Sequence, residues 1–556
     1  MVLTIIGRIN WAAKYLCNKS LIGRRYQVFP FHTRKGKIVR SKKGVPMQIK
    51  LDVIGEHFLS AELKILTAFQ KTSVPKTKGA KAETSVSIDH WSDKGLKEEF
   101  QNLKGAKSFK ASKDESVSFT GALGETVWVV GLGDKTKFHA EDIRKVIAKI
   151  LKGTKSTKFS TIAIDVPGFN TIKDEVRTAQ VIAESAYMTD YSFDKYKSKK
   201  SEPHEFSLIL AHTDKKNNLK LEKALASTKN ICDSISVMKD FINEVPNVLH
   251  SVEYAKRIEA DVKKNLKGVR IKILNKAEIQ KEKMGMFLSV NAGSAHEPRL
   301  VHLTYEPTRS NSKTKHIALI GKGITYDTGG YCIKPGTSMA GMKNDMGGSA
   351  TVYGAFRAAV LEKSPIKITC ILALTDNAIN EHATVPDAVV TARNGKTVEI
   401  LNTDAEGRLI LGDALDYACD LNPHYIIDAA TLTGACLVAL GNQVCAVLGN
   451  DQKWINEILD SAKDQDEYMW QLPIINEWRQ DIKSKVADIK NIGTPMRAGT
   501  AIGAAFLEEF IKNDVKWAHL DIAGVVDSQS HLPYCSAHGA SGLIVRTLTH
   551  LLVNAK

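Results

Sequence analysis

The 556-residue sequence lacks any apolar run approaching the ~20 residues that a membrane-spanning helix needs. It also lacks the strings HExxH, GxSxG and GxxxxGK followed by Ser or Thr, so the signatures of a zincin, an α/β-hydrolase and a P-loop are absent. Its eight cysteines include no CxxC pair. We therefore expect reduced thiols and a cytosolic or mitochondrial matrix compartment, with no association with a membrane.

Acidic residues are absent from the first 51 positions, although twelve Lys or Arg lie between Arg8 and Lys50. The rest of the chain has 65 basic and 61 acidic residues, so the net charge of +16 arises mainly in this segment. Because the body of the protein is nearly balanced in charge, nucleic acid is not an expected partner.

The N-terminal extension, residues 1–46, combines this basicity with apolar residues such as Ile5, Trp11 and Leu16. Such a composition resembles a mitochondrial transit peptide, which predicts a location in the mitochondrial matrix. The alternative is a disordered basic arm on a cytoplasmic protein. A secretory signal fits less well, because the apolar stretch at 2–6 is short.

Short apolar runs alternate with charged, helix-like stretches along the chain, which is typical of an α/β protein. We expect two domains, a smaller N-terminal α/β domain at 47–225 and a larger C-terminal α/β domain at 246–556. A helical pattern at 226–245 predicts a helix that links them.

Near-continuous apolar runs in the larger domain are typical of strands buried on both faces, and hence of a mostly parallel central sheet flanked by helices. Ligands bind to such sheets beyond the carboxyl ends of the strands, so the polar residues that follow these runs are candidates for a site. The runs are 317–320, 366–374, 425–429 and 517–522. In the N-terminal domain the pattern predicts strands at 127–131 and 161–166 and helices at 140–151 and 176–188.

A glycine-rich segment at 321–348 follows the first of these runs and contains Lys322, Asp327, Lys334 and Asp345. Glycines let the backbone turn tightly, so these charged side chains can converge on one point. A lone acid is usually a solvated surface group or a helix cap, but several acids and lysines near strand ends favour a shared site.

A second segment, 402–415, follows a strand-like stretch at 397–400 and leads into a predicted helix. Asp404 and Glu406 lie two residues apart at this turn, and such oxygen ligands suit a hard or borderline divalent cation. Arg408 lies in the first helical turn, where a guanidinium and a helix N-terminus favour an anion.

The octapeptide NTDAEGRL at 402–409 resembles the signature of the leucyl aminopeptidase family of metallopeptidases. The resemblance covers roughly 236–556, with weaker features at 127–133 and 191–198. It also takes in the strings GKGITYDTGG, MKNDMGG, DAATLTGAC, ADIKNIG and WAHLDIAG.

The resemblance implies two divalent cations in one site, commonly zinc, manganese or magnesium. It implies that Asp327 and Glu406 bridge the cations, that Asp404 completes one coordination shell, and that Lys322 and Asp345 complete the other. A lysine ligand must be neutral, which burial and an adjacent cation would enforce.

The resemblance further implies a hydroxide from metal-bound water that attacks the peptide carbonyl. Lys334 would stabilise the oxyanion, and Arg408 would hold a bicarbonate ion that shuttles the proton. Met342 and Leu432 match positions that line the pocket for the first substrate side chain. Without the resemblance, ordinary core packing explains these two residues equally well.

The expected function is release of leucine-like N-terminal residues from peptides, in a homohexamer like the relatives. The chain departs from the family pattern at 376–390, 500–503 and 541–544, which leaves the substrate preference open. These departures motivate an alternative, a catalytically dispensable structural paralogue that forms mitochondrial assemblies.

Overall fold

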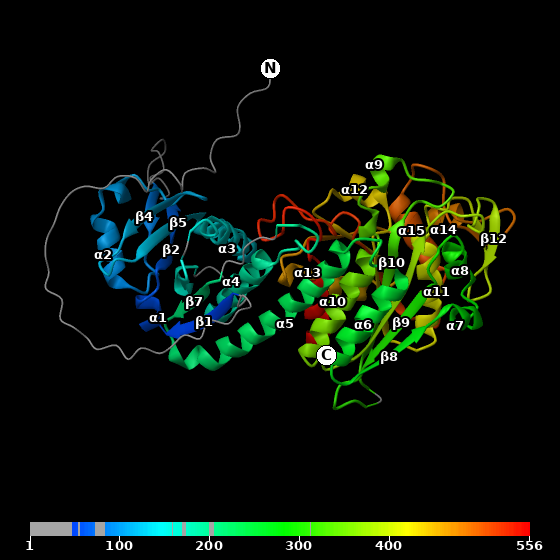
Figure 1. Ribbon diagram of the computed structural model, residues 1–556, viewed down its shortest axis with the longest axis horizontal. Coiled ribbons are helices and arrows are strands. Elements are labelled where there is room, and N and C mark those ends of the chain that lie inside the picture. Colours follow the sequence, from blue (N-terminus) through cyan, green and yellow to red (C-terminus); the bar gives the residue numbers. More distant parts are fainter. Residues whose placement is uncertain are drawn as a thin grey trace, which may run out of the picture. The chain divides into compact units, whose positions relative to one another are not determined.

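The computed structural model describes residues 47–53, 56–72, 84–157, 159–169, 174–199, 205–311 and 313–555 (Figure 1). Residues 1–46, the predicted transit peptide, lie outside the described residues. Within these ranges no helix has the length and apolarity to cross a bilayer. The seven cysteines of the described ranges are all free, as the spacing of the cysteines predicts.

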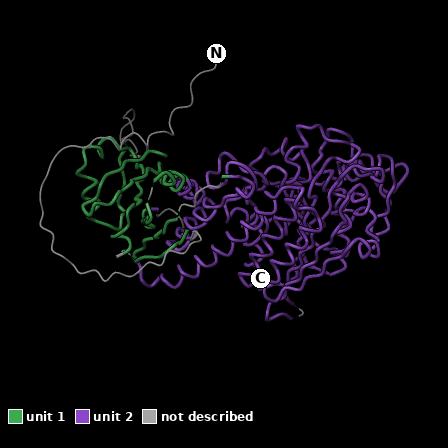
Figure 2. The backbone as a smooth tube through the Cα atoms, in the orientation of Figure 1, with its two compact units in different colours: residues 1–135, 149–168, 199–213 green, residues 136–148, 169–198, 214–556 purple. Residues whose placement is uncertain are grey.

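The chain divides into two compact units, which Figure 2 shows in different colours. Unit 1 consists of 1–135, 149–168 and 199–213, and unit 2 of 136–148, 169–198 and 214–556. Helix α3 (Ala140–Thr154) is divided between the units, and helix α5 (Asn218–Asn243) runs through position 225 without a break. The domain limits expected from the sequence therefore stay a prediction.

Unit 1 contains a seven-stranded sheet with the order β1-β7-β6-β2-β5-β4, in which β3 also pairs with β2. The predicted strands at 127–131 and 161–166 are confirmed as β5 and β6. The elements are β1 (Gln48–Val53), α1 (Glu56–Leu59), β2 (Leu63–Thr72), β3 (Thr84–Ser87), α2 (Lys94–Asn102), β4 (Ser116–Thr120), β5 (Thr126–Asp134), β6 (Thr161–Asp165) and β7 (Ser207–His212).

Unit 2 contains a larger sheet and carries the candidate residues. Its helices are α4 (Glu175–Asp190), α5, α6 (Ser251–Asn265), α7 (Lys276–Lys281), α8 (Gly285–Asn291), α9 (Gly336–Met339), α10 (Gly347–Leu361), α11 (Gly407–Cys419), α12 (Gly434–Leu440), α13 (Gln452–Asp464), α14 (Asn476–Asp481), α15 (Gly499–Glu508) and α16 (Val545–Asn554). Its strands are β8 (Val269–Leu274), β9 (Arg299–Tyr305), β10 (His316–Asp327), β11 (Lys367–Asn377), β12 (Ala388–Thr391), β13 (Thr397–Ile400), β14 (Tyr425–Ala430), β15 (Cys445–Gly449), β16 (Met469–Gln471), β17 (Ile489–Lys490) and β18 (Lys516–Asp521).

The large sheet of unit 2 has the strand order β16-β15-β18-β14-β10-β11-β9-β8. Its central strands β18, β14, β10 and β11 are parallel, whereas β9 and β8 continue antiparallel at one edge. The four apolar runs of the sequence coincide with the central strands, which confirms the mostly parallel sheet. Because parallel strands end at one edge, the residues that follow them lie close together.

Helices cover both faces of this sheet (Figure 1). One apolar cluster joins the sheet to α5, α6, α10, α13 and α16, through residues such as Met238, Tyr353 and Leu548. A second cluster joins the other face to α7, α8, α11 and α15, through residues such as Phe287 and Phe506. This burial on two faces explains why the strands lack polar alternation.

The segment with Asp404 and Glu406 does not follow a strand of the large sheet. It follows β13, which belongs to a separate three-stranded sheet of order β12-β13-β17. The antiparallel pairing of β12 with β13 and the positive φ of Gly395 between them form a hairpin. The apolar pattern at 397–400 predicts the strand correctly, but it does not reveal the strand's partners.

Asp413 of α11 links this hairpin to α8. It is buried and accepts hydrogen bonds from the backbone N–H of Phe287 at 2.9 Å and of Arg393 at 2.8 Å. Burial raises the pKa of Asp413 from 3.8 to about 7. Between these values the folded chain retains a proton that the unfolded chain has released, so the free energy of unfolding falls as pH rises.

The free energy of unfolding of the wild-type protein should therefore decrease between pH about 5 and about 8. In Asp413→Asn this decrease should be smaller by roughly 1 to 3 kcal/mol. Urea unfolding of the wild-type protein and the variant at both pH values measures this difference. Asp488→Asn is the control and should leave the pH difference unchanged, because Asp488 is exposed and hydrogen bonds from Thr397 lower its pKa. Equal pH differences in wild type and Asp413→Asn would contradict the prediction.

Candidate metal centre

Lys322 lies inside β10 and is only 3% exposed. Its Nζ lies 2.8 Å from Asp345 Oδ1 and 2.9 Å from Glu406 Oε1, and it donates to the carbonyl oxygen of Thr431 at 2.9 Å. Burial by itself lowers the pKa of Lys322, but Asp345 and Glu406 outweigh burial and the net shift is upward. The nitrogen is thus held at the centre of a cluster of oxygen atoms.

Gly407 makes room for this lysine. A Cβ atom at position 407 would lie 2.5 Å from Lys322 Cε and 2.7 Å from Lys322 Nζ, closer than van der Waals contact allows. The glycine of NTDAEGRL is therefore required by the approach of a side chain from β10, a role that the sequence alone does not reveal.

A second ion-paired cluster surrounds Lys334. Its Nζ lies 2.8 Å from Asp327 Oδ2 and 2.5 Å from Asp404 Oδ1, and its side chain is 15% exposed. Burial lowers the pKa of Lys334, whereas Asp327 and Asp404 raise it, and the net shift is upward. The loop reaches this position because Gly329 has a φ of 86°.

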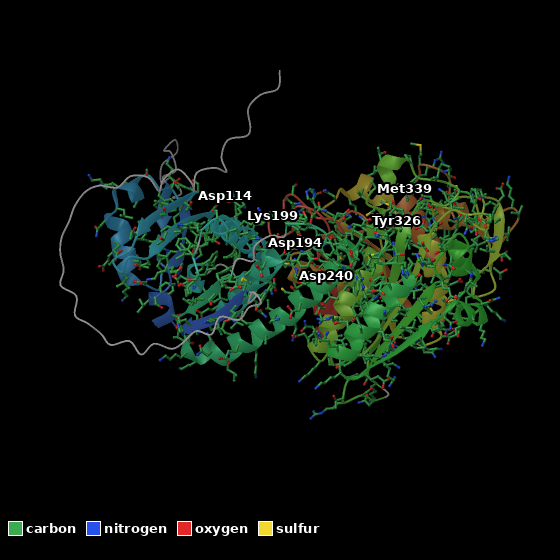
Figure 3. The ribbon with its side chains drawn as sticks, in the orientation of Figure 1. Asp114, Asp194, Lys199, Asp240, Tyr326 and Met339 are labelled. Atoms are coloured by element: carbon green, nitrogen blue, oxygen red, sulfur yellow. The ribbon has the colours of Figure 1, made fainter. Side chains whose placement is uncertain are left out.

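The end of β10 is tied to the helix that follows this loop. The hydroxyl group of Tyr326 donates to the carbonyl oxygen of Met339, the last residue of α9, at 3.4 Å. Figure 3 labels both residues. The chain that follows Lys334 therefore returns to the end of β10, the strand that precedes Lys334.

Three buried acids converge between the two lysines. Asp327, Asp345 and Glu406 each offer an oxygen, and these oxygens lie within 4.8 Å of one another. Burial raises the pKa of both Asp345 and Glu406. Among the described residues, Asp345 Oδ2 and Glu406 Oε2 have no hydrogen-bond partner although both atoms are buried.

Such uncompensated buried oxygens are costly unless a cation balances them. An all-oxygen set with an adjacent amine fits a divalent cation such as magnesium, manganese or zinc. The chemistry of the donors therefore fits a metal site, and the three clustered acids are predicted ligands. Lys322 contacts two of these acids, and Asp404 is linked to the third through Lys334.

Arg408 occupies the first turn of α11 and is buried. Its Nη1 donates to the carbonyl oxygen of Asn491 at 2.8 Å. Burial lowers the pKa of Arg408 to about 10, against the opposing influence of Glu406 and Asp521. The guanidinium is therefore charged at neutral pH and can hold an anion.

The two predicted pocket residues lie on different segments. Leu432 follows β14 and donates its backbone N–H to Asp521 Oδ1 at 3.2 Å. A Cβ atom on Gly503 would lie 3.1 Å from Leu432 Cδ2 and 3.5 Å from Arg408 Nη2, so Leu432 lies near the arginine. Met342 begins the short helix η5 (Met342–Asn344) and is half-buried. Their contact with a substrate stays a prediction.

Other polar residues support the cluster and were missed by the sequence analysis. Thr431 Oγ1 donates to Asp345 Oδ1 at 2.8 Å. Thr403 Oγ1 donates to the carbonyl oxygen of Gly329 at 2.7 Å. The position of Thr431 directly after β14 is the one signal that could have identified it, because strand ends are where ligands bind.

Two models of one protein family match this chain. Residues 236–549 match the cytosol aminopeptidase family, catalytic domain, and residues 74–200 match the N-terminal domain of the same family. The N-terminal and the C-terminal part of the chain therefore both match the same family.

Several bacterial relatives are similar over most of their length. A probable cytosol aminopeptidase of Sulfurihydrogenibium sp. (strain YO3AOP1) is 40% identical over 428 residues, which cover 77% of this chain and 83% of the relative. A probable cytosol aminopeptidase of Fusobacterium nucleatum subsp. nucleatum is 37% identical over 475 residues, which cover 84% of this chain and 94% of the relative. With these matches and the resemblance of NTDAEGRL, the chain belongs to the cytosol aminopeptidase family.

Proposed function

We propose that this aminopeptidase binds two divalent cations at Lys322, Asp327, Asp345, Asp404 and Glu406 and releases leucine-like residues from peptide N-termini. The observation that carries the proposal is the convergence of three buried carboxylates, two of which have oxygens without a hydrogen-bond partner among the described residues. Divalent cations held by these residues would supply hydroxide from water near neutral pH.

Lys334 is proposed to donate to the peptide carbonyl oxygen as that oxygen gains negative charge. Its partial exposure and its contacts with Asp327 and Asp404 support this role, because they hold a cationic donor at the edge of the carboxylate cluster. A fixed donor at this point stabilises the transition state more than the ground state.

Arg408 is proposed to hold a bicarbonate ion, which would carry the proton from water to the leaving amine. Every acid of the cluster is assigned to a cation, so the chain offers no obvious general base of its own. The guanidinium is charged at neutral pH and can hold an anion, which supports this role. Met342 and Leu432 are proposed to contact the first side chain of the substrate.

We also propose that the enzyme is a homohexamer and acts in the mitochondrial matrix. The hexamer rests on the resemblance, and the location rests on the basic, acid-free composition of residues 1–46. The bacterial relatives are named probable cytosol aminopeptidases, so the cytoplasm remains the alternative. A structural paralogue without activity receives no support from the comparisons.

Removal of metal tests the proposed function. We expect dialysis against a chelator to lower hydrolysis of leucine-para-nitroanilide by more than about a hundredfold, and Mn²⁺ or Zn²⁺ to restore it. Elemental analysis should give about two ions per chain in the active protein. Full activity in a protein without bound metal would contradict the proposal.

A further inference from the structure

Asn377 is the last residue of β11 and lies opposite Asp327 in the parallel pairing of β10 with β11. Its side chain is buried, and its Nδ2 donates to Asp327 Oδ1 at 2.8 Å and to the carbonyl oxygen of Thr403 at 3.0 Å. Its own carbonyl oxygen accepts hydrogen bonds from the N–H and the hydroxyl group of Thr328. One residue therefore contacts the segments on which Asp327 and Asp404 lie.

These contacts determine how the Asp327 carboxylate is oriented. Its Oδ1 accepts hydrogen bonds from Asn377 Nδ2 and from the backbone N–H of Gly329 at 2.9 Å. Its Oδ2 faces Lys334 Nζ at 2.8 Å. Two neutral donors thus hold Oδ1 and direct Oδ2 toward the Lys334 ammonium group.

The contact with Thr403 extends this effect to the second segment. Thr403 precedes Asp404, and its Oγ1 donates to the carbonyl oxygen of Gly329 and accepts from the N–H of Cys332 at 2.8 Å. The amide of Asn377 therefore lies at the junction of β10, the glycine-rich loop and the turn before α11. The Asn377 side chain thus joins the segment of Asp327 to the segment of Asp404.

A neutral amide is suited to this task. A lysine or arginine at position 377 would neutralise Asp327 and compete with a metal cation. A carboxylate at this position would repel the Asp327 carboxylate. An amide donates hydrogen bonds without changing the charge of the ligand. Residues that orient metal ligands by hydrogen bonds typically change metal affinity 10–100-fold when they are replaced.

We propose that Asn377 is a positioning residue, which orients Asp327 and fixes its spacing from Asp404 so that both can bind divalent cations. The inference rests on the proposed two-metal function. Asn377 itself is neither a proposed metal ligand nor a proposed catalytic residue.

Calorimetric titration of the full chain with Mn²⁺ tests the inference. We expect Asn377→Leu, which is similar in size but cannot donate, to weaken Mn²⁺ binding about 10–100-fold. At saturating Mn²⁺ its kcat should return to within about threefold of wild type, because the catalytic groups are intact. Asn377→Ala serves as a second variant, since the smaller side chain avoids steric conflict.

Asn291→Leu is the matched control. Asn291 is also a buried asparagine whose Nδ2 donates twice, to the carbonyl oxygen of His296 at 2.8 Å and to Oγ1 of Thr375, a residue of the same strand as Asn377. Thermal unfolding should show destabilisation of both Leu variants. Only the variants at position 377 should bind Mn²⁺ more weakly.

The outcomes separate the inference from the proposed function. Wild-type affinity in both Asn377 variants overturns the inference alone, as does an equal loss of affinity in Asn291→Leu. Absence of Mn²⁺ and Zn²⁺ binding in the wild-type protein overturns the proposed function and the inference together. Selective loss of affinity at position 377 supports both.

Discussion

Glu406→Gln is expected to lower kcat/KM by about a thousandfold or more and to reduce the bound metal to about one ion per chain or less. Glu406 is buried, its Oε1 lies 2.9 Å from Lys322 Nζ, and its Oε2 has no hydrogen-bond partner among the described residues. Glutamine keeps the size of the side chain but removes its negative charge. The proposed loss of several kcal/mol of charge stabilisation corresponds to this change in rate.

The measurement combines steady-state hydrolysis of leucine-para-nitroanilide with elemental analysis of the purified variant. Glu399→Gln is a suitable control, because Glu399 is half-buried in the neighbouring β13 and its Oε2 accepts a hydrogen bond from Ser484. The control should keep its metal and its rate. A Glu406→Gln protein with two bound ions and nearly unchanged kcat/KM would refute the proposed role of Glu406.

Lys334→Met is expected to lower kcat about 10²–10³-fold, the usual effect of removing an oxyanion donor. Metal affinity should remain unchanged or increase in this variant. The Lys334 ammonium group pairs with Asp327 Oδ2 and Asp404 Oδ1, so it competes with a cation for these oxygens. A decrease in kcat without a loss of metal distinguishes this lysine from the proposed ligands.

Steady-state kinetics and calorimetry with Mn²⁺ test both parts of this prediction. Lys396→Met is the control, since Lys396 also pairs with a carboxylate, that of Glu509, but lies outside the proposed site. Its kcat should change by less than about twofold. If Lys334→Met raises KM while kcat is preserved, Lys334 binds the substrate without stabilising the transition state.

The apolar pattern was sufficient to predict much of the fold. The run at 317–320 predicts the core of β10 because this strand is buried on both faces, and the helix-like patterns at 140–151 and 176–188 predict α3 and α4. The partners of β13 could not be predicted, because a four-residue strand contains no information on which sheet it joins. Local patterns specify elements, whereas distant contacts specify their neighbours.

The candidate site shows the same division. The string NTDAEGRL and the glycine-rich loop are sufficient to nominate Lys322, Lys334 and the acids, and the structure brings these side chains together. Asn377 and Gly407 were not predicted, because the importance of each depends on a side chain from another strand. The sequence around an asparagine or a glycine does not show which distant side chain it will contact.

The site draws on chain positions that are far apart in the order of synthesis. Lys322 donates to the carbonyl oxygen of Thr431, 109 residues later. A ribosome that translates this chain must therefore release more than three quarters of it before the last of these contacts can form. A nascent chain that ends between Glu406 and Thr431 contains all five proposed ligands but lacks the carbonyl group that Lys322 Nζ contacts, so this part of the site is assembled only after most of the chain has been synthesised.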